Sequence, residues 1–182
     1  MNDLRQLVVD DRGLLKKIEL CIPGFRGYRL REDIRTADMI LRSYLADQID
    51  SEVQKKIKRV REIFSKSLEL DFLNDIGEII NINKGLIAKI RHAEQGYSGI
   101  SPQYRIEENE LNQIYDYDYK LIESIKGIQL KSELLTNQAR VKNMPEIKKS
   151  FSEIRGELEI LDELFDKRQS QFINTIIRDA GT

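Results

Sequence analysis

Cysteine, histidine and proline are scarce in this chain, and the scarcity of the first two excludes several classes of site. The single cysteine, Cys21, cannot form an intrachain disulfide, and its place in an apolar-periodic stretch favours a small helix residue over a nucleophile. The single histidine, His92, excludes a di-iron centre within one chain, because such centres use two Glu-x-x-His pairs. We expect His92 to lie at a helix end, where the helix dipole favours a cation.

Motifs of catalysis and of cofactor binding are also missing. The chain contains no Walker loop, no Gly-x-Gly-x-x-Gly and no Cys-x-x-Cys, and a Ser-His-Asp or Cys-His site would have to recruit His92. The acidic pairs at 107–108 and 162–163 are typical of solvated helix faces. The sequence therefore predicts a protein that is not an enzyme, with no catalytic residue, cofactor or metal site. A site assembled between subunits is the alternative that stays open.

Long hydrophobic runs are absent as well. No apolar stretch approaches the roughly 18 residues that a membrane-spanning helix needs, and Asp10, Asp11 and Lys16 interrupt any signal-peptide core. With 182 residues and 40% apolar content, the chain is long enough for one sizeable core without disulfides or metal. We therefore expect a single cytoplasmic domain over residues 1–182.

The strongest positive signal is a heptad-type apolar rhythm in two stretches near the C-terminal end. Positions recur at steps of three and four residues, which is the spacing of a helix seam that packs on a partner helix. The first seam consists of Leu111, Ile114, Asp118, Leu121, Ile125, Ile128, Ser132, Leu135 and Ala139. The second consists of Ile147, Phe151, Ile154, Leu158, Leu161, Phe165, Arg168 and Phe172. This rhythm predicts two neighbouring long helices in a bundle.

Three polar residues interrupt these seams. Asp118, Ser132 and Arg168 occupy positions where an apolar side chain is expected. Polar seam residues can fix the register or the number of partner helices at some cost in stability. Alternatively, some of them simply face solvent where the seam drifts around the helix. The sequence leaves both explanations open.

The whole chain divides into helical blocks. We expect a pair of shorter N-terminal helices within 3–46, the first ending at Pro23-Gly24. A long bundle follows over 50–178, in which Asp50 or Ser51 caps a third helix that continues to about residue 93. A loop near 96–105 then joins it to the two seam helices. The predicted fold is all-α, an elongated antiparallel bundle of three long helices with two shorter N-terminal helices.

Two turns and a helical stretch carry recognisable short motifs. Residues 23–28 read Pro-Gly-Phe-Arg-Gly-Tyr, residues 96–99 read Gly-Tyr-Ser-Gly, and residues 115–121 fit Tyr-x-x-Asp-x-x-Leu. These motifs resemble those of a family of uncharacterised prokaryotic all-helical proteins. Residues 38–46 read Asp-Met-Ile-Leu-Arg-Ser-Tyr-Leu-Ala and are similar to the family's Asp-x-x-Leu-Arg-x-x-Leu-Ala pattern. The resemblance implies a shared fold and supplies no activity.

The first of these turns is rich in arginine. Pro23, Gly24 and Gly27 restrict and then free the backbone, while Phe25 and Tyr28 are suited to anchor the turn. Cations near a helix N-terminus are not favoured by its dipole, so they need acidic partners or an anion. The candidate anion-binding residues here are Arg26, Arg29, Arg31 and Arg35. Intrachain ion pairs and an anionic partner both remain possible.

A second basic group lies at the start of the predicted bundle. Residues 26–66 hold eleven Lys/Arg against seven Asp/Glu, whereas residues 67–123 hold five against eleven. Under an antiparallel hairpin, the candidates Lys55, Lys56, Lys58 and Arg59 would lie near Arg140, Lys142, Lys148 and Lys149. Such a patch suits a phosphate backbone or an anionic lipid, although a net charge of −1 and a pI near 6.0 are far from typical nucleic-acid binders.

A tyrosine-rich region is the third candidate surface. Five of the seven tyrosines fall within 97–119, beside Asp116 and Asp118. Exposed tyrosine is common at protein interfaces, although aromatic packing around the loop is an equally ordinary role. The candidate partner-binding residues are Tyr97, Tyr104, Tyr115, Tyr117 and Tyr119.

Together these features predict a non-enzymatic helical scaffold or protein-protein interaction module. We expect it to self-associate, with a dimer as the first expectation, and to bind a protein partner. The second hypothesis is a peripheral protein that binds an anionic membrane or nucleic acid through its basic residues. The sequence ranks the tyrosine-rich region above the basic residues as the partner site.

Overall fold

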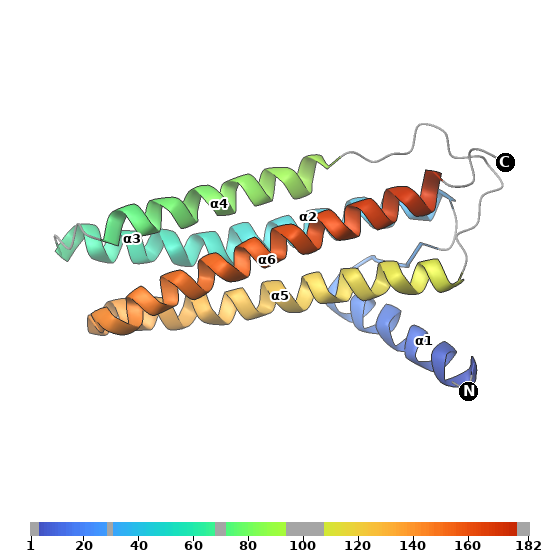
Figure 1. Cartoon of the computed structure of the whole chain (residues 1–182), viewed down its shortest axis with the longest axis horizontal. Coiled ribbons are helices and arrows are strands. Elements are labelled where there is room, and N and C mark those ends of the chain that lie inside the picture. The colour runs from blue at the N-terminus through green and yellow to red at the C-terminus, as the bar shows by residue number, and fades with distance from the viewer. Residues whose placement is uncertain (1–3, 29–30, 68–71, 94–107, 178–182) are drawn as a thin grey trace. The chain divides into compact units, whose positions relative to one another are not determined.

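The computed structural model describes residues 4–28, 31–67, 72–93 and 108–177, and nearly all of them are helical. No strand occurs within these ranges, so the prediction of an all-α fold is confirmed. The elements, shown in Figure 1, are α1 (Leu4–Cys21), α2 (Arg31–Gln48), the π-helix η1 (Ile49–Gln54), α3 (Lys55–Ser67), α4 (Leu73–His92), α5 (Glu108–Val141) and α6 (Met144–Ile177). None of the described helices is both long and apolar enough to span a membrane.

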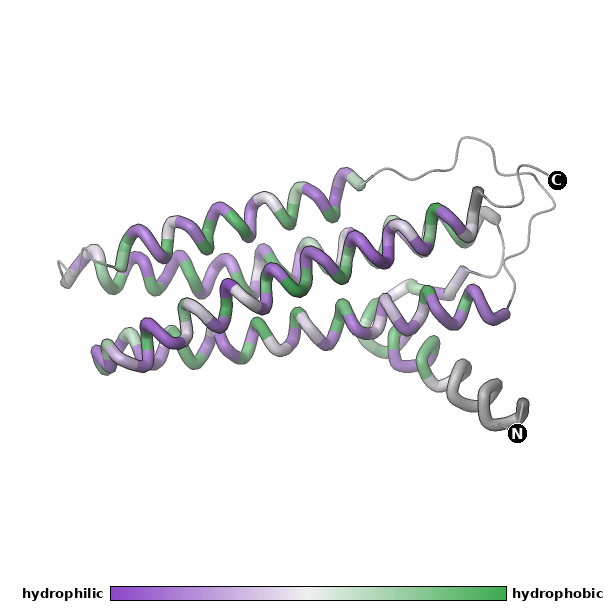
Figure 2. Tube along the Cα trace, in the orientation of Figure 1, coloured by the Kyte–Doolittle hydropathy of each residue, from purple (hydrophilic) through white to green (hydrophobic). Residues whose placement is uncertain are grey.

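The two predicted seams are the core of α5 and α6. Every position of both seams is buried except Leu111, which is partly exposed. Figure 2 shows the resulting pattern, in which apolar and polar residues alternate along each helix with the period of a helical face. The interruptions Asp118, Ser132 and Arg168 are all fully buried, so the explanation that they face solvent is wrong.

A tight turn joins α5 to α6. Lys142 has a positive φ of 56°, and the Asn143 amide donates to the Gln138 carbonyl while the Lys142 amide donates to that of Ala139. These bonds satisfy carbonyls that the end of α5 leaves unpaired. Pro145 follows in the first turn of α6, where its missing amide hydrogen costs nothing, as predicted.

The predicted third helix differs from the structure at its start and in its middle, whereas its predicted end near residue 93 agrees with the end of α4 at His92. Residues 46–54 do not contain a helix start: α2 continues through η1 into α3, with helical backbone on both sides of the π-helix. The Ser51 hydroxyl donates to the Asp47 carbonyl four residues earlier, which is a bond made inside a helix and not a cap. The structure describes α3 to Ser67, and α4 begins at Leu73 and packs on α3, so the expected third helix corresponds to two helices. Helix α4 is continuous through Gly77 and Gly85.

The chain divides into two compact units, and α2, α5 and α6 contribute to both. The first unit contains residues 1–44, 93–121 and 164–182, and the second contains 45–92 and 122–163. The sequence predicted one domain with an N-terminal helical pair, so this interleaved division was not anticipated.

In the second unit the described chain passes back and forth as η1–α3, α4, the second half of α5 and the first half of α6. Helix α4 packs on α3 and η1, and Figure 1 shows it running alongside α3. Side-chain contacts between the segments are Arg91–Asp47 (2.6 Å), Gln129–Gln48 (3.0 Å), Lys131–Glu157 (2.9 Å), Arg155–Glu78 (3.2 Å) and Lys89–Asp162 (2.7 Å). Gln48 of α2 contacts Gln129, and Arg140 lines one pocket with residues of α3, so residue numbers rise together along α2–α3 and α5 and these two segments are parallel. The predicted antiparallel hairpin between the third and fourth helices is therefore wrong for α3 and α5.

Candidate functional site

Five polar residues of the first unit form a closed cluster, which we call the buried polar network. They come from four places in the sequence: the turn after α1, α2, α5 and α6. The members are Tyr28, Asp38, Arg42, Asp118 and Arg168. Each is at most 4% exposed. Charged side chains at this depth are rare unless they are paired, so the cluster has to satisfy its own charges.

Arg168 is the centre of the network. Its Nε donates to Asp118 Oδ1 at 2.9 Å, its Nη1 to Asp38 Oδ1 at 2.5 Å, and its Nη2 to the Tyr28 hydroxyl at 2.9 Å. The planar guanidinium can serve three partners at once because its donors point outward in a fixed fork. One face of it lies 4.4 Å from the Phe172 ring centroid, which adds a cation–π contact.

The other members donate the remaining hydrogen bonds to the two carboxylates. The Tyr28 hydroxyl donates to Asp118 Oδ2 at 2.6 Å, and Arg42 Nε donates to Asp38 Oδ2 at 2.8 Å. All four carboxylate oxygens thereby accept at least one bond. Two carboxylates face two guanidinium groups, so the network is electrically balanced as well as hydrogen-bonded.

Burial and the neighbouring charges shift the pKa of three members. Burial, reinforced by the Asp118 carboxylate, raises the pKa of Tyr28 well above its usual value. Burial also raises the pKa of Asp118, although Arg168 and the Tyr28 hydroxyl oppose that change. Burial alone would lower the pKa of Arg168, but the neighbouring carboxylates Asp118 and Asp38 raise it well above its usual value. Tyr28 therefore stays protonated and Arg168 stays charged across ordinary pH.

The turn that carries Tyr28 depends on two glycines. Gly24 and Gly27 have φ of 84° and 82°, in the region that side chains other than glycine rarely adopt. A Cβ on Gly27 would lie within 2.4 Å of the Tyr115 hydroxyl oxygen. That hydroxyl accepts a hydrogen bond from the Tyr28 amide at 3.0 Å, and Phe25 and Tyr28 are buried, so the predicted anchoring of the turn is confirmed.

The network joins distant segments of the chain. Its side chains are buried and hydrogen-bonded to one another, and Arg42 also donates to the Ala93 carbonyl at 3.5 Å. It thereby links the turn, α2, α5 and α6 within the first unit. Among the described residues, no three His, Cys, Asp or Glu side chains are placed to hold a metal ion.

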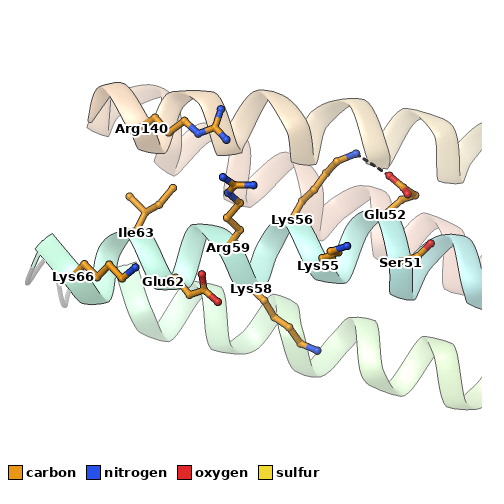
Figure 3. A pocket seen from close by; sticks show the side chains of 10 residues that line it. All are labelled: Ser51, Glu52, Lys55, Lys56, Lys58, Arg59, Glu62, Ile63, Lys66 and Arg140. Carbon is orange, nitrogen blue, oxygen red and sulfur yellow. Dashed lines mark hydrogen bonds and ion pairs between the residues drawn. The ribbon is translucent and has the colours of Figure 1, made fainter.

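A groove of about 740 Å³ in the second unit is the accessible candidate, and we call it the basic groove. Its lining comes from η1, α3 and the end of α5. The lining residues are Ser51, Glu52, Lys55, Lys56, Lys58, Arg59, Glu62, Ile63, Lys66 and Arg140. In Figure 3, Arg59 and Ile63 point from α3 toward the segment of α5 that carries Arg140, whereas Lys58 points away.

Positive charge in the basic groove is largely uncompensated. Lys56 Nζ pairs with Glu52 at 3.3 Å, and Arg140 Nη1 donates to the Asn137 side chain at 3.3 Å. Four further cations make no ion pair with any residue that the structure describes; they are Lys55, Lys58, Arg59 and Lys66. Like charges that line one groove repel one another, and an anion bound there would relieve that repulsion.

Five of the basic residues that the sequence predicted to lie together do line the basic groove. They are Lys55, Lys56, Lys58, Arg59 and Arg140. The other predicted contributors, Lys142, Lys148 and Lys149, do not line the groove, and Lys148 Nζ lies 5.9 Å from the Phe72 ring centroid.

The tyrosine candidates are divided by the structure. Tyr97 and Tyr104 lie outside the described residues. Tyr115 is only 4% exposed and stacks on Tyr28, so it belongs to the core and cannot offer a binding surface, which corrects the prediction. Tyr117 and Tyr119 are partly exposed, with Lys120 Nζ and Lys17 Nζ over their rings at 6.0 and 5.1 Å. The buried Tyr115 hydroxyl and the cations over the other two rings reduce the aromatic surface on this helix.

The described arginine candidates of the first turn, Arg26 and Arg35, are exposed and are not members of the network. Arg29 lies outside the described residues, and Arg31 begins α2 with its side chain outside the described part. The arginine at the centre of the network is Arg168, which the sequence marked only as an interruption of a seam. A charged residue at an apolar seam position was the signal for it and for Asp118.

No family model, no curated protein and no solved structure matches this chain. The function has to be argued from the geometry of the two sites.

Proposed function

We propose that this chain is a non-enzymatic interaction module that binds an acidic segment of a partner protein in the basic groove. One observation carries the proposal: four cations of the groove lining have no ion-pair partner among the described residues, and one of them, Arg59, points toward the α5 side of the groove (Figure 3). Unpaired charges of one sign give electrostatic complementarity to an acidic partner and speed its encounter.

The other lining residues favour a protein partner over a polyphosphate. Glu52 and Glu62 lie among the cations and would repel an unbroken row of phosphates. Ile63 offers an apolar contact that an amphipathic helix can use as an anchor. No aromatic side chain lines the groove, so the stacking that holds single-stranded nucleic acid is missing there.

The shape of the site argues against a membrane partner. The lining comes from two separate segments, the continuous η1–α3 and the end of α5, with Ile63 and Arg59 pointing between them (Figure 3). A bilayer surface is flat on this scale and contacts convex faces, whereas a helix or an extended segment can enter a groove.

Binding of three anionic probes tests the proposal. They are a fluorescent helical peptide with glutamates and leucines on one face, a DNA oligonucleotide of the same net charge, and phosphatidylserine vesicles. We expect the peptide to bind most tightly and its affinity to fall with added salt. The double variant Lys55→Gln/Arg59→Gln should lower that affinity about tenfold, equivalent to about 1.4 kcal/mol.

Lys84→Gln is the matched control, since Lys84 is an exposed lysine of α4 that does not line the groove. It should leave the peptide affinity within about twofold. If the oligonucleotide or the vesicles bound more tightly than the peptide, and the double variant lost that binding, the natural partner would be a nucleic acid or a membrane and not a protein. If Lys55→Gln/Arg59→Gln bound the peptide as tightly as Lys84→Gln does, the groove would be excluded as the binding site.

A further inference from the structure

A second apolar line runs along α5, on the face opposite its core seam. Leu130, Leu134 and Val141 are 70%, 54% and 75% exposed, although each is a large aliphatic residue. With the exposed Asn137 they recur at steps of four, three and four residues. This is heptad spacing, so the four side chains lie in one stripe, which we call the outer stripe.

The outer stripe is not a random scatter of apolar residues. Of the six large hydrophobic residues that are exposed in the described chain, three lie on this short segment of one helix. Single exposed apolar residues are normal on soluble proteins, but a contiguous apolar line indicates a contact surface. An asparagine within such a line is typical of helix pairs, where it fixes register at some cost in affinity.

We propose that a second copy of this chain covers the outer stripe, with the two α5 helices packed antiparallel. If the pairing is centred between residues 135 and 136, Leu130 lies opposite Val141 of the partner subunit. Leu134 then lies opposite Asn137 of the partner subunit. Because the arrangement has twofold symmetry, each contact occurs twice.

Charge complementarity selects this arrangement. Glu133 and Arg140 flank the same side of the stripe, and in the antiparallel register each approaches its opposite in the second copy. Glu133 is exposed and makes no ion pair with a described residue, and Arg140 contacts only the Asn137 side chain at 3.3 Å. Two ion pairs between copies therefore form without breaking an ion pair within either copy.

The parallel alternative is less favourable. In parallel heptad pairing, Lys126 of one copy would face Lys131 of the other, which places like charges together. Glu133 would face Gln138 and gain no ion pair. Only the antiparallel register pairs the free acid with the free base.

The outer stripe is short, so the expected dimer is weak. Twelve residues of helix extend about 18 Å at 1.5 Å per residue, which is less than a standard interface needs. Packing against α6 already holds α5 in helical form, through contacts such as Lys131–Glu157 at 2.9 Å, so association does not have to order the helix. We therefore expect dissociation constants of about 10–100 μM, within the range of transient dimers.

Sedimentation equilibrium of the full chain tests the proposal. We expect a monomer–dimer equilibrium, and Leu130→Ser/Leu134→Ser should raise the dissociation constant at least tenfold with the helical content unchanged. Ile160→Ser is the matched control, because Ile160 is a 59% exposed aliphatic residue on α6, outside the stripe. It should leave the dimer intact.

A charge exchange tests the register separately. Glu133→Arg and Arg140→Glu should each weaken the dimer, and the double variant should restore it, because the ion pairs are re-formed with reversed polarity. The groove variant Lys55→Gln/Arg59→Gln should dimerise normally, which keeps this proposal distinct from peptide binding.

A monomer at all concentrations up to about 1 mM would overturn the dimer. A dimer that survives Leu130→Ser/Leu134→Ser would place the interface elsewhere. Failure of the double charge exchange to restore association would overturn the antiparallel register. If the serine variant instead lost binding to phosphatidylserine vesicles while the chain stayed monomeric, a lipid surface would replace the second copy as the occupant of the stripe.

Discussion

The buried polar network and the basic groove both concentrate charged side chains, but they treat charge in opposite ways. In the network, two arginines face two aspartates at depths where no side chain is more than 4% exposed. In the groove, lysines and arginines line an open surface, and four of them have no ion-pair partner within the described chain. The first arrangement has to be balanced because water cannot stabilise it. The second can stay unbalanced because water does.

Because of this difference, we expect the network to affect folding stability and the groove to affect partner binding. Removing one member of a buried, balanced set leaves an opposite charge without a partner, which costs several kcal/mol. Removing one exposed cation changes folding little, but it weakens the attraction of an anionic partner. Substitutions in the two places should therefore have effects that hardly overlap.

The largest effect is expected at Arg168. Arg168→Met should lower the free energy of unfolding by about 3–5 kcal/mol, because Asp38 and Asp118 would both lose their central partner while buried. Urea denaturation followed by circular dichroism measures the change. Lys58→Met in the groove is the comparison and should shift stability by less than about 0.5 kcal/mol. Similar losses at both residues would remove the distinction between the two regions.

Gly27 is expected to show the next largest effect. Gly27→Ala should destabilise the protein by about 2–4 kcal/mol, since the residue has a φ of 82° and its new Cβ would displace the Tyr115 hydroxyl. Gly77→Ala is the matched control, because nothing lies within 4 Å of a Cβ there and the backbone is helical. That variant should gain up to about 1 kcal/mol. A neutral Gly27→Ala would mean that the turn can relax.

The pKa of Tyr28 predicts a loss of stability in alkali. Below the ordinary pKa of 10.0, Tyr28 is protonated in the folded and unfolded chain, so its contribution is complete. Above that pH the unfolded chain releases the proton while the buried residue holds it, so stability falls as pH rises, by up to about 1.4 kcal/mol per pH unit. Denaturation of the wild type and of Tyr28→Phe between pH 8 and 11 measures the difference.

The Tyr28→Phe variant should start less stable at pH 8, since Asp118 Oδ2 loses its donor, and the gap to the wild type should narrow above pH 10. A gap that stays constant over this range would mean that Tyr28 ionises as readily in the folded protein as in the unfolded chain.

The smallest effect on folding is expected in the groove. Lys55→Gln/Arg59→Gln should change the free energy of unfolding by less than about 0.5 kcal/mol, with any change toward greater stability, because it removes repulsion between exposed cations. Thermal denaturation at low and high salt measures this. A clear loss of stability would show that these side chains contribute to packing as well as to surface charge.

The sequence predicted the helical faces better than the connections between helices. All but one of the seam positions are buried, since a period of three and four residues is a property of any helix with one covered face. The division into two helices, α3 described to Ser67 and α4 from Leu73, was missed, because the sequence has neither proline nor glycine between them. The helix start predicted at Asp50 or Ser51 was wrong, because a serine that can cap a helix can equally bond within one.

The position of Arg140 shows how a correct neighbour can follow from an incorrect topology. The antiparallel hairpin model placed Arg140 beside Lys55–Arg59, and the groove does contain both. The contact Gln129–Gln48 and the position of Arg140 beside α3 together show that α5 instead runs parallel to the α2–α3 segment. When two helices are paired once in parallel and once antiparallel, one pair of residues is adjacent in both arrangements. Arg140 and the basic residues of α3 lie near that pair, so the wrong topology still placed them together.

The sequence by itself determined that this chain is helical, which faces of α5 and α6 are covered, and where polar residues enter the seams. Those properties depend on local spacing, which the order of residues contains directly. Only the tertiary structure decided that Asp118 meets Arg168, 50 positions away, and that Asp38 and Tyr28 complete the same cluster. Which buried charges become partners depends on how helices cross in space, and a periodic pattern carries no information about that crossing.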